Sequence, residues 1–328
     1  MLYYYALLYY NINLKQIKTM KKIRLITALI GLLAFSTLAK ADIKVVTSIK
    51  PIHSLASYIM DGVGSPGLIV DGYNSPHSFQ LKPSHAKMLE QADIIFWVGE
   101  DFENFLEKTL DSIANKAEKI ELIKIKGINK LKFRERNIFN EHGHDVKKEE
   151  HANQDDHVNH GNGEYDSHIW LDPINAKIIL NNITEHLIEN DSKNVSTYKS
   201  NLAKALAEID KLIIDVITKT NKDLNYVVFH DAYQYYENRF NINILGAITV
   251  NPDVMPGAEQ IHEIREIIER DNVSCVLSEP QFNPDIIKSI AKDTNVKTGV
   301  LDPLGANLNK GKNLYFDLIR NMSSSFNC

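Results

Sequence analysis

Short apolar runs alternate with amphipathic segments along the chain from residue 43 onward. The runs are rich in β-branched residues and bounded by turn-forming residues, so we expect each to form a buried strand. These predicted strands fall at residues 43–49, 67–72, 93–99, 119–125, 226–230, 242–248, 273–279 and 297–303. Apolar side chains at three- and four-residue spacing predict helices between them, at residues 52–61, 84–91, 102–115, 231–239, 259–270, 284–293 and 313–322. This alternation is typical of parallel sheets with helices on both faces.

One long amphipathic stretch separates the two groups of predicted strands. Residues 194–221 place apolar side chains every three or four positions, with Lys, Asp and Glu between them. At a rise of about 1.5 Å per residue, such a helix would be about 40 Å long. We therefore predict an α/β fold in which two parallel-sheet lobes, residues 42–193 and 222–328, are joined by a long rigid linking helix. The alternative is an ordinary helix within one lobe.

The N-terminal region, residues 1–41, has the features of an export signal. A basic segment at residues 21–24 precedes an uncharged, largely apolar stretch, and Ala39 and Ala41 fit the small-residue cleavage rule. We expect cleavage after Ala41, which would leave the mature chain in the periplasm. The stretch is shorter than the roughly 20 residues of a membrane-spanning helix, so we predict no direct membrane insertion. Because Met20 begins a signal that looks complete, residues 1–19 are expected to lie before the true start.

Charge and cysteine content restrict the possible partners. Loss of the signal region removes six Lys and Arg and no Asp or Glu, which takes the formal net charge from −5 to −11. Such a charge argues against nucleic acid and anionic lipid as partners. The two cysteines, Cys275 and Cys328, are expected to form one disulfide in the oxidising periplasm and to pin the C-terminal helix.

Histidines carry the candidate chemistry, and five of the twelve lie in residues 134–167. That stretch has no apolar periodicity and is crowded with polar residues, so we expect a disordered surface loop. Neutral imidazole is a good ligand for zinc, copper and nickel. The loop is therefore predicted to hold auxiliary metal ligands, although a merely solvated insertion is the alternative. Its histidines are His142, His144, His151, His157 and His160.

Three other histidines and one carboxylate lie where parallel α/β proteins bind ligands, just past the carboxyl ends of strands. His77 follows the strand at 67–72, His168 follows the loop, and His230 and Asp302 end later strands. Each signal is weak alone, because a single histidine at a strand end is more often structural. Together they compose a tetrahedral zinc site drawn from both lobes. The remaining histidines are expected to be structural: His53, His85, His186 and His262.

The sequence contains no catalytic motif in the structural context that such a motif requires. Residues 62–67 match the glycine-rich dinucleotide pattern, but they follow a predicted helix and precede a strand, the reverse of a phosphate-binding turn. The sequence has no GxSxG, Walker or HExxH motif. Glu237 and Glu279 are available carboxylates, but nothing marks either one as a general base. We therefore predict that the protein is not an enzyme.

Several stretches resemble the zinc-binding proteins of high-affinity zinc ABC transporters (ZnuA-type). They cover residues 43–328 in order and include SIKPIHSL, NSPHSFQLKPSHAKMLEQADIIFWVG, HIWLDP, VVFHDAYQYYENRFN, LSEPQFNP and GVLDPLG. The resemblance implies two α/β lobes with zinc (Zn2+) held between them as the transported ligand. It also implies delivery to a membrane permease that is powered by a cytoplasmic ATPase. The family's three metal histidines fall on His77, His168 and His230, its carboxylate on Asp302, and its paired cysteines on Cys275 and Cys328.

One departure from the family pattern concerns the fourth ligand. Some members have Glu directly before the first metal histidine, whereas this chain has Pro76. Proline cannot bind a metal, so we expect the fourth ligand to be Asp302 in the first place, then water, then a loop histidine. Three imidazoles favour zinc over manganese, which prefers carboxylates. We expect the protein to act as a monomer.

Two other functions are compatible with the residues. One is a receptor for another divalent metal, such as manganese, with an adhesin-like role; a lipid anchor for it would need a cysteine where this chain has Asp42. The other is a zinc hydrolase, for which we find no general base and no substrate pocket. Zinc delivery is the function that we expect.

Overall fold

The computed structural model describes residues 42–134, 138, 164–249, 252, 256–292 and 294–328. The chain separates into two compact units, residues 1–42 and 43–328, and the second carries the fold. The expected signal region and the five loop histidines lie outside the described residues. Among the residues that are described, no helix is long and apolar enough to cross a bilayer.

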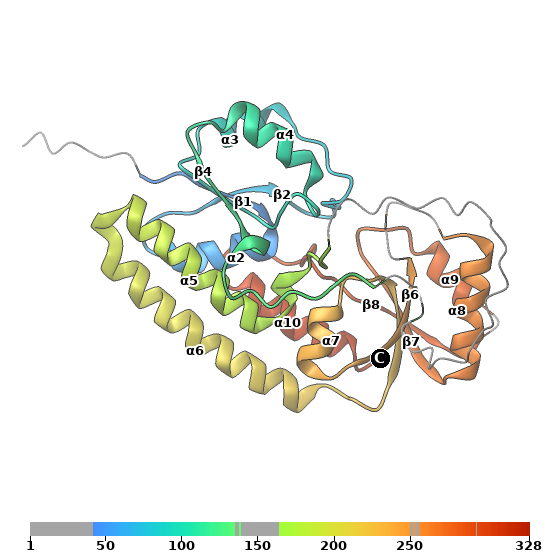
Figure 1. The fold of residues 1–328 in the computed structure, drawn as a ribbon. Helices are drawn as coiled ribbons and strands as arrows, with labels where there is room; N and C mark the ends of the chain where they lie inside the picture. The colour runs from blue at the N-terminus through green and yellow to red at the C-terminus, as the bar shows by residue number, and fades with distance from the viewer. Residues whose placement is uncertain (1–41, 135–137, 139–163, 250–251, 253–255, 293) are drawn as a thin grey trace, which may run out of the picture. The chain divides into compact units, whose positions relative to one another are not determined.

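The first sheet has four parallel strands in the order β2-β1-β3-β4 (Figure 1). Helix α2 covers one face of it, and α3 and α4 cover the other. The bounds of these elements are β1 (Val45–Ile49), α2 (Lys50–Ile59), β2 (Gly67–Val70), α3 (Pro83–Glu90), β3 (Ile94–Trp97), α4 (Asn104–Ile113) and β4 (Glu118–Glu121). The strand predicted at 119–125 is shorter than expected, because the chain turns into the 3-10 helix η1 (Leu122–Lys124).

The second sheet repeats the arrangement, with four parallel strands in the order β6-β5-β7-β8. Its elements are β5 (Asn225–His230), α7 (Gln234–Phe240), β6 (Asn243–Thr249), α8 (Ala258–Arg270), β7 (Val273–Ser278), α9 (Asp285–Ala291), β8 (Lys297–Val300) and α10 (Leu314–Ser325). Along β5, Tyr226 and Val228 pack into one apolar cluster and Val227 and Phe229 into another. Both faces are therefore buried, which explains the continuous apolar run in the sequence. The predicted α/β fold with two parallel-sheet lobes is confirmed.

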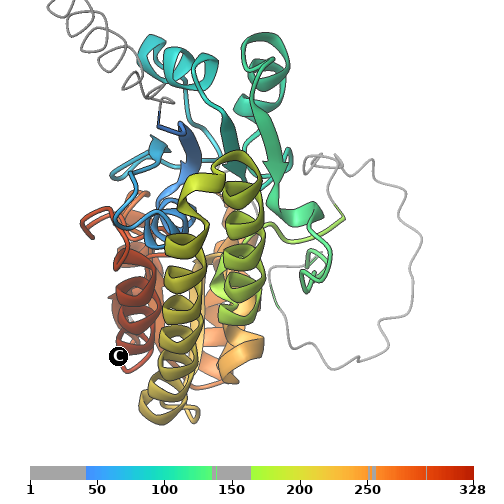
Figure 2. The same cartoon turned by 90° about the vertical axis from the view of Figure 1, so that its left-hand side faces the viewer.

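Two adjacent helices, α5 (Pro173–Asn190) and α6 (Val195–Lys219), connect the sheets and lie side by side (Figure 2). The short 3-10 helix η3 (Ser192–Asn194) joins them. Helix α6 has 25 residues and is about 37 Å long at about 1.5 Å per residue, close to the linking helix predicted at 194–221. Apolar periodicity alone did not reveal α5. Its start does carry a signal, because Asp172 caps the helix by accepting from Ile174 N at 2.9 Å and proline occupies the first position.

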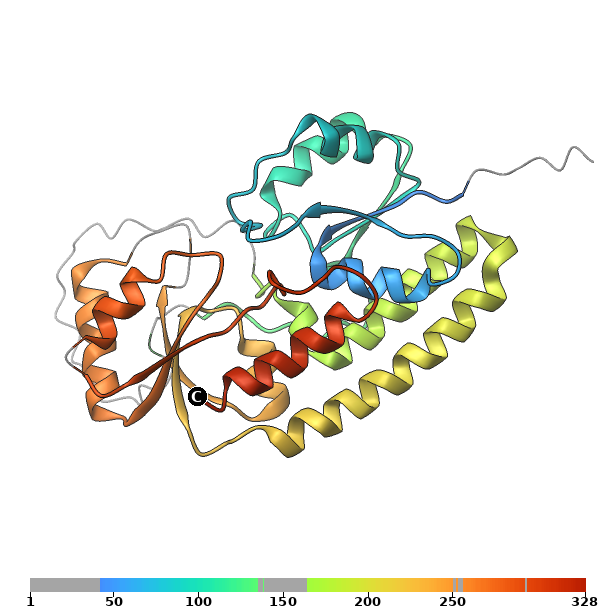
Figure 3. The ribbon, with the colours of Figure 1, turned by 180° about the vertical axis from the view of Figure 1, so that it is seen from behind.

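The C-terminal helix α10 returns toward the first sheet, where it packs against α2 and α6 (Figure 3). The backbone N–H of Tyr315 donates to Ser54 Oγ of α2 at 2.9 Å, and the Tyr315 hydroxyl donates to Trp170 O at 2.9 Å. One apolar cluster consequently includes residues of both sheets, α5, α6 and α10. The two lobes share a core in addition to the linking helix.

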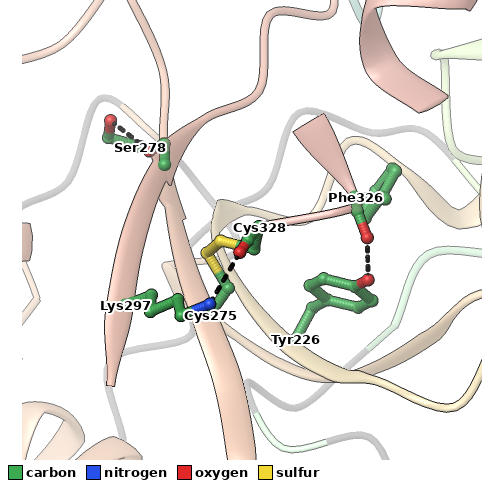
Figure 4. The surroundings of a disulfide bond; sticks show 7 residues. Tyr226, Cys275, Ser278, Lys297, Phe326 and Cys328 are labelled. Carbon is green, nitrogen blue, oxygen red and sulfur yellow. Dashed lines mark hydrogen bonds between the residues drawn. A yellow bond between two sulfur atoms is a disulfide. The ribbon is translucent and has the colours of Figure 1, made fainter. Parts of the chain in front are cut away.

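The predicted disulfide between Cys275 and Cys328 is present and joins β7 to the last residue of the chain (Figure 4). Nearby, Lys297 Nζ donates to the Cys328 carbonyl at 3.0 Å, and the Tyr226 hydroxyl donates to the Phe326 carbonyl. The segment after α10 is thus held on the second sheet by covalent and polar contacts.

Candidate metal centre

Three histidines converge near the carboxyl ends of strands from both sheets. His77 lies in the loop after β2, His230 is the last residue of β5, and His168 directly precedes the 3-10 helix η2 (Ile169–Leu171). One ring nitrogen of each lies within 4.8 Å of the other two. The Nε2 atoms of His168 and His230 are 3.4 Å apart. Zinc bonded tetrahedrally to two nitrogens at about 2.0–2.1 Å separates them by about 3.4 Å, so this pair already has ligand spacing.

Carboxylates orient two of these rings. His168 Nδ1 lies 2.7 Å from Asp166 Oδ1, and the backbone N–H of His168 donates to the same oxygen at 2.9 Å. His230 Nδ1 lies 2.5 Å from Glu279 Oε1, on the residue that follows β7. When each Nδ1 donates its proton to the carboxylate, Nε2 is left as the free ligand atom. This carboxylate–histidine arrangement is the usual support of a metal-binding imidazole.

His77 is held differently from the other two histidines. Its ring meets Phe102 edge-on, with centroids 5.0 Å apart, and its backbone N–H donates to Ser75 Oγ at 3.3 Å. The side chain is only partly buried, whereas His168 and His230 are 4% and 3% exposed. His77 is therefore the most exposed of the three histidines.

The environment sets the protonation of the three rings. Burial lowers the pKa of both His77 and His168 well below the ordinary value. The charge of His230 lowers both pKa values further, and that of His168 also lowers the pKa of His77. Burial would also lower the pKa of His230, but the charge and hydrogen bond of Glu279 outweigh it and raise that pKa. At neutral pH two imidazoles are thus neutral and ready to bind, and His230 holds a proton more readily.

Asp302 lies outside this cluster, although the sequence placed it at the same end of a strand. Its Oδ1 accepts the backbone N–H groups of Leu304 and Gly305 at 3.0 and 2.9 Å, and its Oδ2 accepts that of Ala306 at 2.6 Å. Gln281 Nε2 also donates to Oδ1, at 3.1 Å. Both carboxylate oxygens are therefore occupied by the turn after β8, and that strand ends at Val300, earlier than predicted.

Glu279 and Asp166 contact two of the histidines but are absent from the site predicted from the sequence. Glu279 was noted only as an available carboxylate, yet its position just after β7 is the same strand-end signal that identified His230. Asp166 lies two residues before His168, a spacing that allows contact with both the ring and the backbone of that histidine.

The histidines that were expected to be structural behave in several ways. His53 is buried in α2, where burial lowers its pKa to about 4. His85 accepts the Lys82 backbone N–H at 3.2 Å and so caps α3, while His262 is exposed on α8. His186 differs, because it lies in a second group of potential metal ligands with Glu118 and Glu189.

The three histidines line a small pocket with aromatic and apolar walls and room for about one water molecule. Its other lining residues include Phe102, Trp170, Glu279, Phe282 and Leu304. Three imidazoles in a small, largely apolar pocket suit a borderline divalent ion such as zinc.

A family model described as "ZnuA: Zinc-uptake complex component A periplasmic" matches residues 45–327. Among curated proteins, the chain is similar to the high-affinity zinc uptake system protein ZnuA of Brucella abortus (strain 2308). The two are 43% identical over 327 residues, which cover 94% of this chain and 98% of the relative.

Solved structures show the same fold. A structure described as "Crystal structure of ZnuA" matches with a TM-score of 0.69 at 21% identity, covering 87% of this chain and 99% of that one. A mutant structure of the laminin-binding adhesin Lmb from Streptococcus agalactiae matches with a TM-score of 0.70 at 23% identity, covering 87% and 98%. At these identities the likeness concerns the fold alone.

Proposed function

Because the chain belongs to the zinc-uptake complex component A family, we propose that it captures zinc in the periplasm and delivers it to the permease of an ABC importer. The observation that carries this proposal is the convergence of three histidines, two of them oriented by buried carboxylates. Export with cleavage after Ala41, and action as a monomer, are parts of the same proposal.

We propose His77, His168 and His230 as the protein ligands of zinc, with water in the fourth position. Asp302 is less suited to that position, because both of its oxygens already accept backbone N–H groups. Its role is instead to shape the turn at residues 302–306. Trp170, a wall of the pocket, donates from Nε1 to Pro303 O of that turn at 2.9 Å.

The pocket supports binding in preference to catalysis. Its buried carboxylate, Glu279, is engaged by His230, so it is not placed as a base for an attacking water. The space beside the histidines is smaller than most organic substrates require. We therefore propose that the protein is not an enzyme and that zinc is its cargo.

The shared core restricts how zinc could be released. Apolar side chains of both sheets, α5, α6 and α10 form one cluster, so a wide hinge motion would expose a large apolar surface. His77, in contrast, lies in a loop and is only partly buried. We propose that release involves a local shift of this loop, which the permease would sense at the surface of the lobes.

A competitive chelator titration of purified residues 42–328 tests the function. We expect one tight zinc site and manganese binding that is weaker by at least about 100-fold, because manganese prefers oxygen ligands. A strain without the gene should also grow poorly under zinc limitation. Comparable manganese affinity, or normal growth, would favour the manganese or adhesin alternative, and turnover of an activated ester by the zinc form would favour a hydrolase.

Zinc affinity is expected to fall as the pH drops below the raised pKa of His230. Zinc binds neutral imidazole, so below that pKa each bound ion must displace a proton. His77 and His168 have lowered pKa values and stay neutral over this range, so one proton per zinc is expected. Calorimetry in buffers of different ionisation enthalpy measures the number of protons released. An affinity that does not change between pH 7.5 and 5.5, or a release of three protons near neutral pH, would contradict this assignment.

A further inference from the structure

A second group of metal-ligating side chains lies at the opposite edge of the first sheet. Glu118 is the first residue of β4, and His186 and Glu189 are one turn apart near the end of α5. One ligand atom from each lies within 4.8 Å of the others. His77, in contrast, follows the carboxyl end of β2, so the two groups lie at different ends of parallel strands.

The imidazole of His186 is held in place but lacks a hydrogen-bond partner at one nitrogen. Its Nδ1 is buried and lies 2.8 Å from Glu118 Oε1, yet the two groups are not oriented to form a hydrogen bond. The other Glu118 oxygen accepts from Asn190 Nδ2 at 2.9 Å. The ring packs edge-on against Phe96, with centroids 6.2 Å apart. Nδ1 therefore has a carboxylate oxygen as its neighbour without a well-aligned hydrogen bond to it.

The charges at this group favour a cation. Within the described part of the chain, no lysine or arginine forms an ion pair with Glu118 or Glu189. Two carboxylates and an imidazole at this distance are a common donor set for divalent metals. Zinc bonded tetrahedrally to a nitrogen and an oxygen at about 2.0–2.2 Å would hold them about 3.4 Å apart, so the Glu118 carboxylate, now 2.8 Å from His186 Nδ1, would have to move slightly outward to admit the ion.

We propose that Glu118, His186 and Glu189 form a second binding site for a divalent transition-metal ion. Zinc is the ion with which we test it. Water would complete the coordination, because the chain supplies three donors and Glu189 is exposed. The bound ion would link β4, an edge strand, to α5. With two carboxylates in place of two imidazoles, this site discriminates less between zinc and manganese than the three-histidine site.

The test is a zinc titration of purified residues 42–328. It measures how many zinc ions per chain bind more weakly after the tight site is filled, and each such ion is called a weaker equivalent. His186→Ala and Glu189→Gln are each expected to remove one weaker equivalent and to change the tight affinity by less than about twofold, because the sites share no residues. His262→Ala is the matched control. His262 also lies near a glutamate on an exposed helix, 3.3 Å from Glu266, but it has no third donor in the described structure. The histidines of residues 134–167 are the same in every variant, so the difference between variants reports this site.

Diffraction at the zinc absorption edge gives an independent measurement on crystals of the same chain. An anomalous peak between the three side chains that disappears in Glu189→Gln supports the site. An unchanged number of weaker equivalents in both variants overturns it, as does a peak at crystal concentration with no matching loss in solution. His77→Ala should remove the tight equivalent alone, so failure of this proposal and failure of the proposed function are distinguishable.

Discussion

Replacing His168 with alanine is expected to weaken zinc binding to the mature chain by more than about 100-fold. Four-ligand zinc sites bind with about 10–16 kcal/mol, or about 3 kcal/mol per ligand, and each 1.4 kcal/mol is about tenfold in affinity. His168 is also one of the two rings whose Nε2 atoms already have ligand spacing. Competitive chelator titration measures the loss, and circular dichroism shows whether the variant is folded.

Two further variants provide reference values for this loss of zinc affinity. Glu279→Gln keeps the hydrogen-bonding shape but removes the charge beside His230, and substitutions at such supporting residues typically cost about 10–100-fold in metal affinity. His262→Ala removes an exposed histidine and should leave the tight affinity unchanged. If His168→Ala binds zinc as tightly as His262→Ala, the three-histidine assignment is wrong.

Loss of the disulfide is expected to lower the free energy of unfolding by about 2–4 kcal/mol. Cys275 and Cys328 are 53 residues apart in the sequence. Closing a loop of that length lowers the conformational entropy of the unfolded chain, which raises its free energy by about 4 kcal/mol at most. The bond also holds the segment that follows α10, a helix that packs on α2 and α6. Guanidinium unfolding of Cys275→Ser/Cys328→Ser measures the change.

Reduced wild-type protein is the control for this variant. It should unfold at the same denaturant concentration as the double serine variant, because both lack only the cross-link. The zinc affinity of the two forms should stay close to that of the oxidised protein, since neither cysteine lines the pocket. Unchanged stability would mean that contacts such as Lys297 to the Cys328 carbonyl suffice to hold the C-terminus.

Local patterns were enough to predict the strands and most helices. The runs of the inner strands β1, β3, β5 and β7 are buried along almost their whole length, as continuous apolar runs require. The period of the 194–221 stretch matches α6. The strand-end rule marked His77 and His230 as candidates at the carboxyl ends of strands. His168 follows no strand, and the two marked histidines belong to different sheets, so the packing of the sheets brings the three together.

The same rule was insufficient for Asp302 and Glu279. Both residues follow strands, but hydrogen bonds to the turn at residues 304–306 draw Asp302 away from the histidines. Glu279 instead meets His230, 49 positions earlier in the chain. Nothing in the neighbouring sequence distinguishes the two carboxylates, since the difference lies in which backbone groups and side chains surround each one after folding.

The sequence by itself determined the strands and most helices, the parallel α/β class, the pairing of the two cysteines and the strand ends that carry His77 and His230. These follow from local periodicity, from composition and from the geometry of parallel strands. Only the tertiary structure decided that α10 packs on α2, that Asp166 and Glu279 orient two imidazoles, and that Glu118 meets His186 across 68 positions of sequence. Such contacts depend on distances between segments far apart in the chain, and local sequence carries no measure of those distances.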